Sequence, residues 1–127
     1  MDVRTVRDVE PVVEHNGTTP VWWLVPPREM YEATRGGHLE LIAVWEINGG
    51  GEVFSHTHPT HEFYYVLSGR AIMVIEDEER EISEGDLVYI PPSKVHSVRT
   101  VSPNSGVKAV SFAVGEPDAG QIDYTHH

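Results

Sequence analysis

Short β-prone segments recur along this chain from Leu39 onward at intervals of roughly ten residues, each followed by a turn signal. In the first, LELIAVWEI, the odd positions are all apolar, whereas the even positions include Glu40 and Glu46. This period of two is typical of a strand with one buried face. The later segments are VFSHTH, EFYYVLSG, RAIMVIED, REISEGDLVYIPP, VHSVRTV and VKAVSFAV. Such a series predicts an all-β fold, either a barrel or a double-sheet jelly roll.

The residues before Leu39 are less regular. We expect an N-terminal strand over Val3–Val13, which contains scattered β-branched residues. The run VWWLV lies between Pro20 and the pair Pro26-Pro27, and prolines at these positions predict an edge strand or the end of a sheet. Arg28–Arg35 has a helical composition but is short, so we expect a single turn or a loop.

The chain has 127 residues, the size of a single domain. We expect one domain over residues 1–127, with a barrel core at about 38–115 and an N-terminal strand arm at 1–30. No stretch approaches the roughly 18 apolar residues of a membrane span. The opening MDVRTVRDVE carries charges where a secretory signal is apolar. The expected location is therefore the cytoplasm, with no membrane partner.

The net charge of −11 and the absence of cysteine limit which partners and which kinds of catalytic or metal site are expected. A surface this acidic repels a phosphate backbone, so we do not expect nucleic acid as a partner. The expected partner is a small molecule. Without cysteine there is no disulfide, no thiol catalysis and no thiolate metal site. Any metal site must use histidine, carboxylate, carbonyl or water ligands.

The stretch GGEVFSHTHPTHEFYYVLSG contains the candidate chemistry. His56 and His58 are two residues apart on an expected strand, so both imidazoles should project from one face. The turn that follows brings Glu62 to the start of the next strand, where it can point to the same side. Two imidazoles and a carboxylate are ligands for a divalent metal ion. A lone His-x-His pair is more often a polar pair on a solvent face, but the extended spacing favours a metal site.

The spacing G-x5-H-x-H-x3-E-x6-G resembles the first signature of the cupin superfamily, with Gly50, His56, His58, Glu62 and Gly69 at its fixed positions. The second cupin signature is G-x5-P-x-G-x2-H-x3-N, and this chain has GDLVYIPPSKVHSVRT. Gly85, Pro91 and His96 match it. Ser93 replaces a glycine at a turn, where a positive φ is more costly for serine, and Thr100 replaces the asparagine at a structural position.

The resemblance implies a single-domain cupin jelly-roll β-barrel, also called a double-stranded β-helix. It also implies that His56, His58, Glu62 and His96 bind one divalent transition metal, whose identity (Fe, Mn, Zn, Ni or Cu) the ligands do not select. Four protein ligands leave open positions on a six-coordinate metal, as in catalytic sites. By analogy with small cupins we expect a homodimer to which Val3–Val25 contributes.

Several other residues could belong to the site. Tyr64 shares the ligand face and either orients a substrate or acts as an acid, or simply fills the barrel. His61 is expected at a turn or beside a ligand rather than on the metal. We expect Trp45 and Met73 in the core, and Glu76–Glu81 at a solvated hairpin tip. Surface, loop or terminal positions are expected for the remaining candidates, which are His15, His38, His126, His127, Arg28, Arg70 and Lys94.

Two functions of different class follow. The first is a metal-dependent enzyme acting on a small, oxygen-rich, metal-chelating molecule, with dioxygenase-like chemistry ahead of lyase, decarboxylase or isomerase activity. The second is a non-catalytic, metal-dependent ligand-binding or sensing cupin. An open metal site favours the enzyme.

Overall fold

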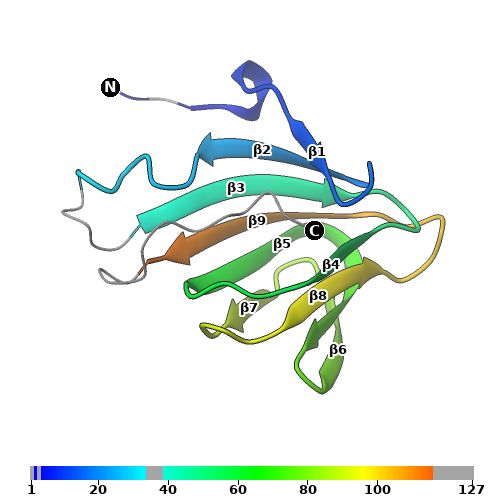
Figure 1. Ribbon diagram of the computed structural model, residues 1–127. Coiled ribbons are helices and arrows are strands. Elements are labelled where there is room, and N and C mark those ends of the chain that lie inside the picture. The colour runs from blue at the N-terminus through cyan, green and yellow to red at the C-terminus, as the bar shows by residue number, and fades with distance from the viewer. Residues whose placement is uncertain (1, 3, 34–38, 116–127) are drawn as a thin grey trace.

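The computed structural model describes residues 2, 4–33 and 39–115. In this part of the chain a short 3₁₀ helix, η1 (Val6–Asp8), precedes nine strands. They are β1 (Val12–Glu14), β2 (Thr19–Val25), β3 (Leu39–Ile47), β4 (Glu52–His56), β5 (His61–Ile75), β6 (Glu78–Ser83), β7 (Leu87–Ile90), β8 (His96–Thr100) and β9 (Val107–Val114), as Figure 1 shows. The expected all-β fold is confirmed. No helix within these residues has the length and apolar character needed to cross a membrane.

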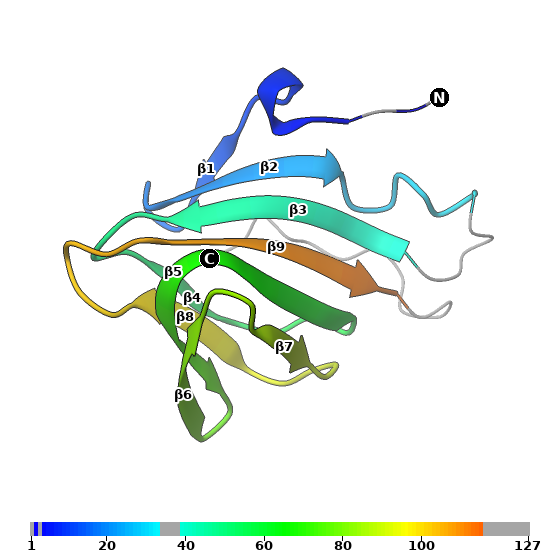
Figure 2. The same cartoon turned by 180° about the vertical axis from the view of Figure 1, so that it is seen from behind.

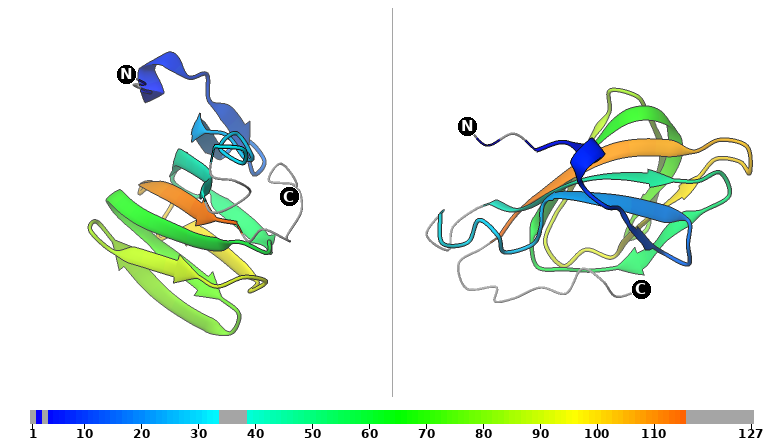
Figure 3. Two further views of the ribbon diagram at one scale, coloured as in Figure 1. Left: turned by 90° about the vertical axis from the view of Figure 1, so that its left-hand side faces the viewer. Right: turned by 90° about the horizontal axis from the view of Figure 1, so that it is seen from above.

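All strand pairs are antiparallel, and the hydrogen-bonded order is β1-β2-β3-β9-β5-β8-β4. Strand β5 belongs to both sides of the fold. Its first part pairs with β9 and β7, and its second part, from Arg70 on, pairs with β8 and β6. Seen from behind, β6 and β7 lie on the side of β5 away from β3 (Figure 2). The sheet curls around the core as a jelly-roll half-barrel (Figure 3).

Gly69 marks the point where β5 passes from one side of the fold to the other. Its φ is 83°, a left-handed conformation, and the register between β5 and β9 shifts just before it, between Val66 and Ser68. A Cβ atom at position 69 would collide with the backbone carbonyl of Gly106. Glycine is required here both for the positive φ and for the close approach of the backbone at Gly69 to the backbone at Gly106.

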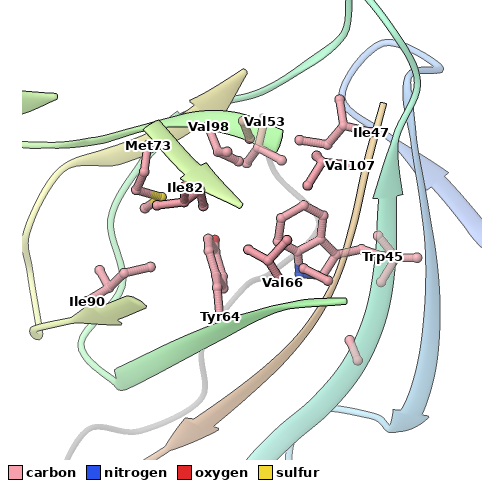
Figure 4. Packing of buried hydrophobic residues seen from close by; sticks show 14 residues of the cluster. Trp45, Ile47, Val53, Tyr64, Val66, Met73, Ile82, Ile90, Val98 and Val107 are labelled. Atoms are coloured by element: carbon pink, nitrogen blue, oxygen red, sulfur yellow. The ribbon is translucent and has the colours of Figure 1, made fainter. Parts of the chain in front are cut away.

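Strand β3 packs one face against the core, as its alternation predicts. Leu41, Ala43, Trp45 and Ile47 are buried, and the Trp45 ring meets the Tyr64 ring edge to face, 5.0 Å between centroids. Each large apolar side chain buried in this way contributes roughly 1.5–3 kcal/mol. The expected core positions of Trp45 and Met73 are confirmed. Figure 4 shows the cluster, which also contains Val53, Val66, Ile82, Ile90, Val98 and Val107.

The N-terminal arm differs from the expectation at one point and agrees with it at another. The expected strand over Val3–Val13 is wrong, because Val6–Asp8 forms a 3₁₀ turn capped by the Thr5 side chain and the strand begins only at Val12. The expected edge position of VWWLV holds from Trp22 onward, because the short strand β1 pairs only with Thr19–Val21 of β2. Pro20 removes an N–H only at the start of β2, so the other residues of that strand keep their donors.

The remaining local expectations are met within the described residues. Residues 28–33 form turns. The charge run Glu76–Glu81 begins at the turn between β5 and β6 and is exposed. Ser93 takes a positive φ of 63° where the cupin signature has glycine. The Thr100 hydroxyl accepts a hydrogen bond from the Gly50 N–H at 2.8 Å, so this position is structural.

Candidate metal centre

The four predicted ligand residues lie together at one end of three strands. His56 is the last residue of β4 and His96 is the first residue of β8, and the two are paired across these strands. Glu62 is the second residue of β5. The expectation that His58 lies on a strand with His56 is wrong, because β4 ends at His56 and His58 lies in the loop that follows. The rings of His56 and His58 nevertheless converge, with 5.4 Å between centroids.

The three histidines lie close enough together to share one ion, and Glu62 adjoins two of them. One nitrogen of each of His56, His58 and His96 lies within 4.8 Å of the other two. The Oε1 atom of Glu62 lies 3.3 Å from Nε2 of His58 and 3.4 Å from Nε2 of His96. Nitrogen and oxygen ligands of transition metals stand about 2.0–2.2 Å from the ion. Donor atoms on opposite sides of an ion are therefore about 4 Å apart, and adjacent donors about 3 Å.

The Nδ1 atom of each imidazole makes a hydrogen bond on the side away from Glu62. Nδ1 of His56 lies 2.6 Å from the Phe54 carbonyl and Nδ1 of His96 lies 2.9 Å from the Lys94 carbonyl. A carbonyl only accepts, so both rings carry their proton on Nδ1 and leave the Nε2 lone pair available. Nδ1 of His58 lies 2.9 Å from the Thr60 hydroxyl. Such bonds fix the orientation of metal-binding histidines.

Two atoms of this centre are buried and lack a hydrogen-bond partner in the structure, Oε1 of Glu62 and Nε2 of His96. Both residues are almost fully buried. Buried polar atoms are rarely left without a partner, because each costs about 1–3 kcal/mol. A cation between the two atoms would satisfy both. The donor set therefore fits a divalent transition metal.

The protonation states of His56 and Glu62 at neutral pH are those needed to bind a cation. Burial is the main cause that lowers the pKa of His56 to about 4, and the neighbouring His96 and His58 lower it further. Burial alone would raise the pKa of Glu62, but in the chain without metal, hydrogen bonds from His58 and His96 and positive charge on these rings outweigh burial and lower that pKa to about 2. His56 is thus neutral and Glu62 is anionic, the forms in which each can bind a metal.

Tyr64 lies beside this centre and is also part of the core. Its side chain is buried, and its ring is 6.4 Å from that of His96. Burial, the negative charge of Glu62 and a hydrogen bond with Glu62 raise the pKa of Tyr64 well above its usual value. The phenol therefore stays protonated at neutral pH and acts as a hydrogen-bond donor. Both descriptions weighed from the sequence, cavity lining and core filling, apply to it.

The other sequence candidates lie away from the centre. His61 faces the opposite side of β5, where its Nδ1 atom lies 2.7 Å from the Tyr89 hydroxyl. The Arg28 guanidinium stacks on the Tyr31 ring at 3.9 Å, while Arg70 and Lys94 are exposed. His38, His126 and His127 fall outside the described residues.

Sequence analysis missed two residues near the centre, Glu14 and His15. His15 lies in the turn after β1, as expected of a loop histidine, but it is buried rather than at the surface: its ring lies 6.1 Å from that of His56, and its Nδ1 atom accepts the Phe54 N–H at 3.1 Å. The sequence does hold a signal, since Asn16-Gly17 between two β-prone runs is typical of a hairpin turn. That hairpin places β1 beside β2 and brings His15 over the end of β4.

A cavity of about 70 Å³ adjoins the centre. Its walls combine ligand residues, aromatic rings and small hydroxyls: Glu14, His15, Thr19, Val21, Trp23, Leu41, Ala43, Trp45, Val53, His56, His58, Glu62, Tyr64 and Ser111. A larger groove, about 290 Å³, lies between β6 and β7 and contains none of the four ligand residues. We assign the chemistry to the smaller cavity, because the convergent polar groups line it.

The fold and this centre define a jelly-roll barrel with a candidate histidine-carboxylate metal site. The sequence profile of the cupin domain matches residues 43–112. An uncharacterised protein from Methanocaldococcus jannaschii is 38% identical over 101 residues, which cover 78% of this chain and 76% of that protein. The chain belongs to the cupin family.

Solved structures agree with this assignment at the level of the fold. A predicted oxalate decarboxylase from Thermotoga maritima has a TM-score of 0.74 at 19% identity, covering 89% of this chain and 98% of that one. The polyketide cyclase RemF from Streptomyces resistomycificus has a TM-score of 0.72 at 20% identity, covering 98% of this chain and 89% of that one.

Proposed function

We propose that this protein binds one divalent transition metal through His56, His58, Glu62 and His96 and acts as an enzyme on a small, oxygen-rich molecule that chelates the metal. Dioxygenase-type chemistry is the first candidate. The observation that supports the proposal is the cluster of three imidazoles beside a cavity, two of them next to a buried carboxylate oxygen. Such an arrangement costs desolvation energy that a protein without a cation at this point does not recover.

The ligand set leaves room for a substrate. Three neutral imidazoles and one carboxylate give a divalent ion a net charge near +1, and a six-coordinate metal keeps two further positions. When bound, the metal supplies Lewis-acid activation of a chelating substrate or the reactivity toward O₂ of related open sites. The ligands suit Fe, Mn, Zn, Ni or Cu, and the order of affinities and the supply of each metal both influence which one is bound.

Residues of this chain would hold the site in shape and keep water out. The hydrogen bonds from the His56 and His96 rings to backbone carbonyls fix the direction of their Nε2 atoms. The protonated Tyr64 hydroxyl lies in the same cavity wall as Glu62 and has one proton, which it could donate either to Glu62 or to a bound oxygen. Trp23 and Trp45 form an apolar wall that lowers the local dielectric and strengthens these contacts.

Two solved neighbours have names that suggest further reactions to assay, decarboxylation of oxalate and polyketide cyclisation. Lyase, decarboxylase and isomerase activities therefore follow dioxygenase chemistry in order of preference. The alternative of a non-catalytic ligand-binding or sensing cupin uses the same centre without turnover.

The experiment is metal analysis of the full chain purified without chelator, followed by O₂ uptake with β-diketones, hydroxy acids and thiols. We expect one metal per chain, and O₂ consumption that depends on Fe(II) and one of these substrates. Stoichiometric metal with tight ligand binding but no product would instead favour the sensing protein. Absence of any metal binding would contradict the proposal in both forms.

A further inference from the structure

One sheet of the barrel carries apolar side chains on its outer face as well as on its inner face. Strands β2, β3, β9, β5 and β7 lie side by side in this sheet (Figure 2). Ala43 and Trp45 of β3 point into the core. Successive residues of a strand point to opposite faces, so Ile42 and Val44 point outward. Strands that are apolar on both faces are typical of sheets covered on both sides.

Two rows of outward side chains cross these strands. In the first row each residue lies opposite the next across a strand pair, and its members are Trp22, Val44, Val110, Tyr65 and Leu87. The second row is built in the same way from Ile42, Phe112, Phe63 and Tyr89. Directly opposed residues of antiparallel strands point to the same face. The two rows therefore form one surface, which we call the outer apolar face.

Aromatic rings make up much of the outer apolar face. The Phe63 ring stacks on the Phe112 ring with 4.9 Å between centroids and lies 5.1 Å from the Tyr89 ring. In the first row, Tyr65 is 41% exposed and Leu87 is 57% exposed. Soluble monomers rarely expose contiguous apolar patches larger than a few hundred Å², and aromatic residues are enriched in protein interfaces. These properties are typical of a contact surface.

The distribution of charge favours a second copy of this chain as the partner. The residues of the two rows are all uncharged, although the chain has a net charge of −11. Glu46 and Lys108, next to the first row on β3 and β9, are opposed and balance each other, with 3.8 Å between Oε1 and Nζ. An uncharged centre with a polar border is the usual arrangement of a protein interface. Two acidic molecules repel each other least where they meet through such a surface, whereas an anionic membrane would repel the chain as a whole.

The size and shape of the face also suit a second copy. Five strands about 4.8 Å apart, with three outward positions about 6.8 Å apart, span roughly 500 Å² in plan, and side-chain relief brings this toward the roughly 800 Å² per partner of a standard interface. Leu87 and Tyr89 on β7 are about half exposed, whereas Val44 on β3 is 9% exposed. A two-fold axis parallel to the strands would lay the exposed β7 side of each copy on the less exposed β3 side of the other, as an isologous contact requires.

We infer that two copies of this chain pack their outer apolar faces against each other, sheet on sheet. Packed sheets stand about 10 Å apart with their side chains interdigitated, so Tyr65 and Leu87 of each copy would be buried by the other. Such a dimer goes beyond the proposed function and needs no metal. Val13 lies opposite Pro20 in the β1–β2 pair, and Pro20 alternates with Trp22, so Val13 continues the same face at its β1 edge.

The test is the dissociation constant of the full chain, measured by sedimentation equilibrium over a range of concentrations. Tyr65→Lys puts a charge in the face and also reduces the net negative charge, so weaker association could not come from greater overall repulsion. The matched control is Val95→Lys, which makes the same addition of charge at a residue 45% exposed just before β8, outside the face. Tyr65→Ser removes apolar area without adding a charge, and circular dichroism checks that each variant is folded.

We expect dimers for the unmodified chain and for Val95→Lys. Tyr65→Lys should raise the dissociation constant at least about thirtyfold, and Tyr65→Ser by a smaller factor. If both Tyr65 variants stay dimeric while Val13→Lys is monomeric, the contact is at the β1 edge and the inference is overturned. A monomeric unmodified chain would overturn it too, and binding of that monomer to phosphatidylcholine vesicles, weakened by Tyr65→Lys, would identify the face as a lipid contact. Metal analysis of the same samples tests the proposed function separately.

Discussion

His56 and His96 lie directly opposite each other on β4 and β8, with 4.3 Å between their ring centroids. These two residues are distant in the sequence and meet only because the strands pair in one register. A slip by one residue would turn one of the rings to the other face of the sheet. The geometry of the candidate metal centre therefore depends on the register in which β4 pairs with β8.

The first prediction concerns the ligands. His96→Ala should lower metal affinity at least about a hundredfold, because it removes one of four donors from a site whose binding energy depends on all of them. His61→Ala is the matched control, since His61 faces Tyr89 on the other side of β5. Isothermal titration with Zn(II) measures both. Equal affinities in the two variants would contradict the predicted ligand set.

The second prediction concerns the partner of His58. Thr60→Val keeps the shape of a buried residue but removes the hydroxyl 2.9 Å from Nδ1 of His58. Loss of such an orienting bond typically costs about 10–100-fold in metal affinity, and we expect an effect in this range. Thr57→Val, at an exposed position of the same loop, should change the affinity less than about twofold. Unchanged binding by Thr60→Val would show that the hydroxyl does not orient the ring.

The third prediction concerns acid stability without metal. The pKa of His56 is lowered from 6.5 to about 4 in the folded chain, so between these values the unfolded chain binds a proton that the folded chain does not. The free energy of unfolding should fall by about 2 kcal/mol as pH decreases through this window, allowing for partial exposure of the ring. Below pH 4.5 the lowered pKa of Glu62 adds a further loss.

Urea unfolding of the chelator-treated protein at several pH values measures this dependence. His56→Gln cannot take up the proton, so its free energy of unfolding should change less between pH 6.5 and pH 4. Parallel pH profiles for the two proteins would rule out His56 as the source.

The fourth prediction concerns the bend in β5. Gly69→Ala should destabilise the fold by at least about 3 kcal/mol, because it adds a collision with the Gly106 carbonyl to the cost of a positive φ. Gly85→Ala shares the positive φ, but nothing lies within 4 Å of its added Cβ. That control should lose only about 1 kcal/mol. Thermal unfolding compares the two, and similar losses would exclude the collision.

The fifth prediction is the homodimer, which the structure of one chain does not test. Val12 and Val13 on the edge strand β1 are about half exposed, at 46% and 56%, and apolar edge strands favour pairing with another chain. We expect a dimer by light scattering, and a monomer for Val13→Lys. A dimer that survives this change would place the interface elsewhere, and a monomeric unmodified chain would refute the expectation.

Much of the fold could be predicted from the sequence, because the alternation in 39–47 and the spacing of later strands are local signals. The four candidate ligands also came from local spacing and family resemblance. The position of His58 after the end of β4 was missed, because a Thr-His-Pro sequence gives no sign of where pairing stops. Glu14 and His15 were missed for another reason: their place beside the centre depends on how the N-terminal hairpin folds back over β4, a contact between segments far apart in the chain.

The passage of β5 from one side of the fold to the other has a consequence for how the molecule loses its structure. The same continuous strand pairs with β7 and β9 at one end and with β6 and β8 at the other, so we expect loss of β5 to disrupt both halves. Heating should therefore unfold both halves in one cooperative step. Any bound ion would be released in that same step rather than before it.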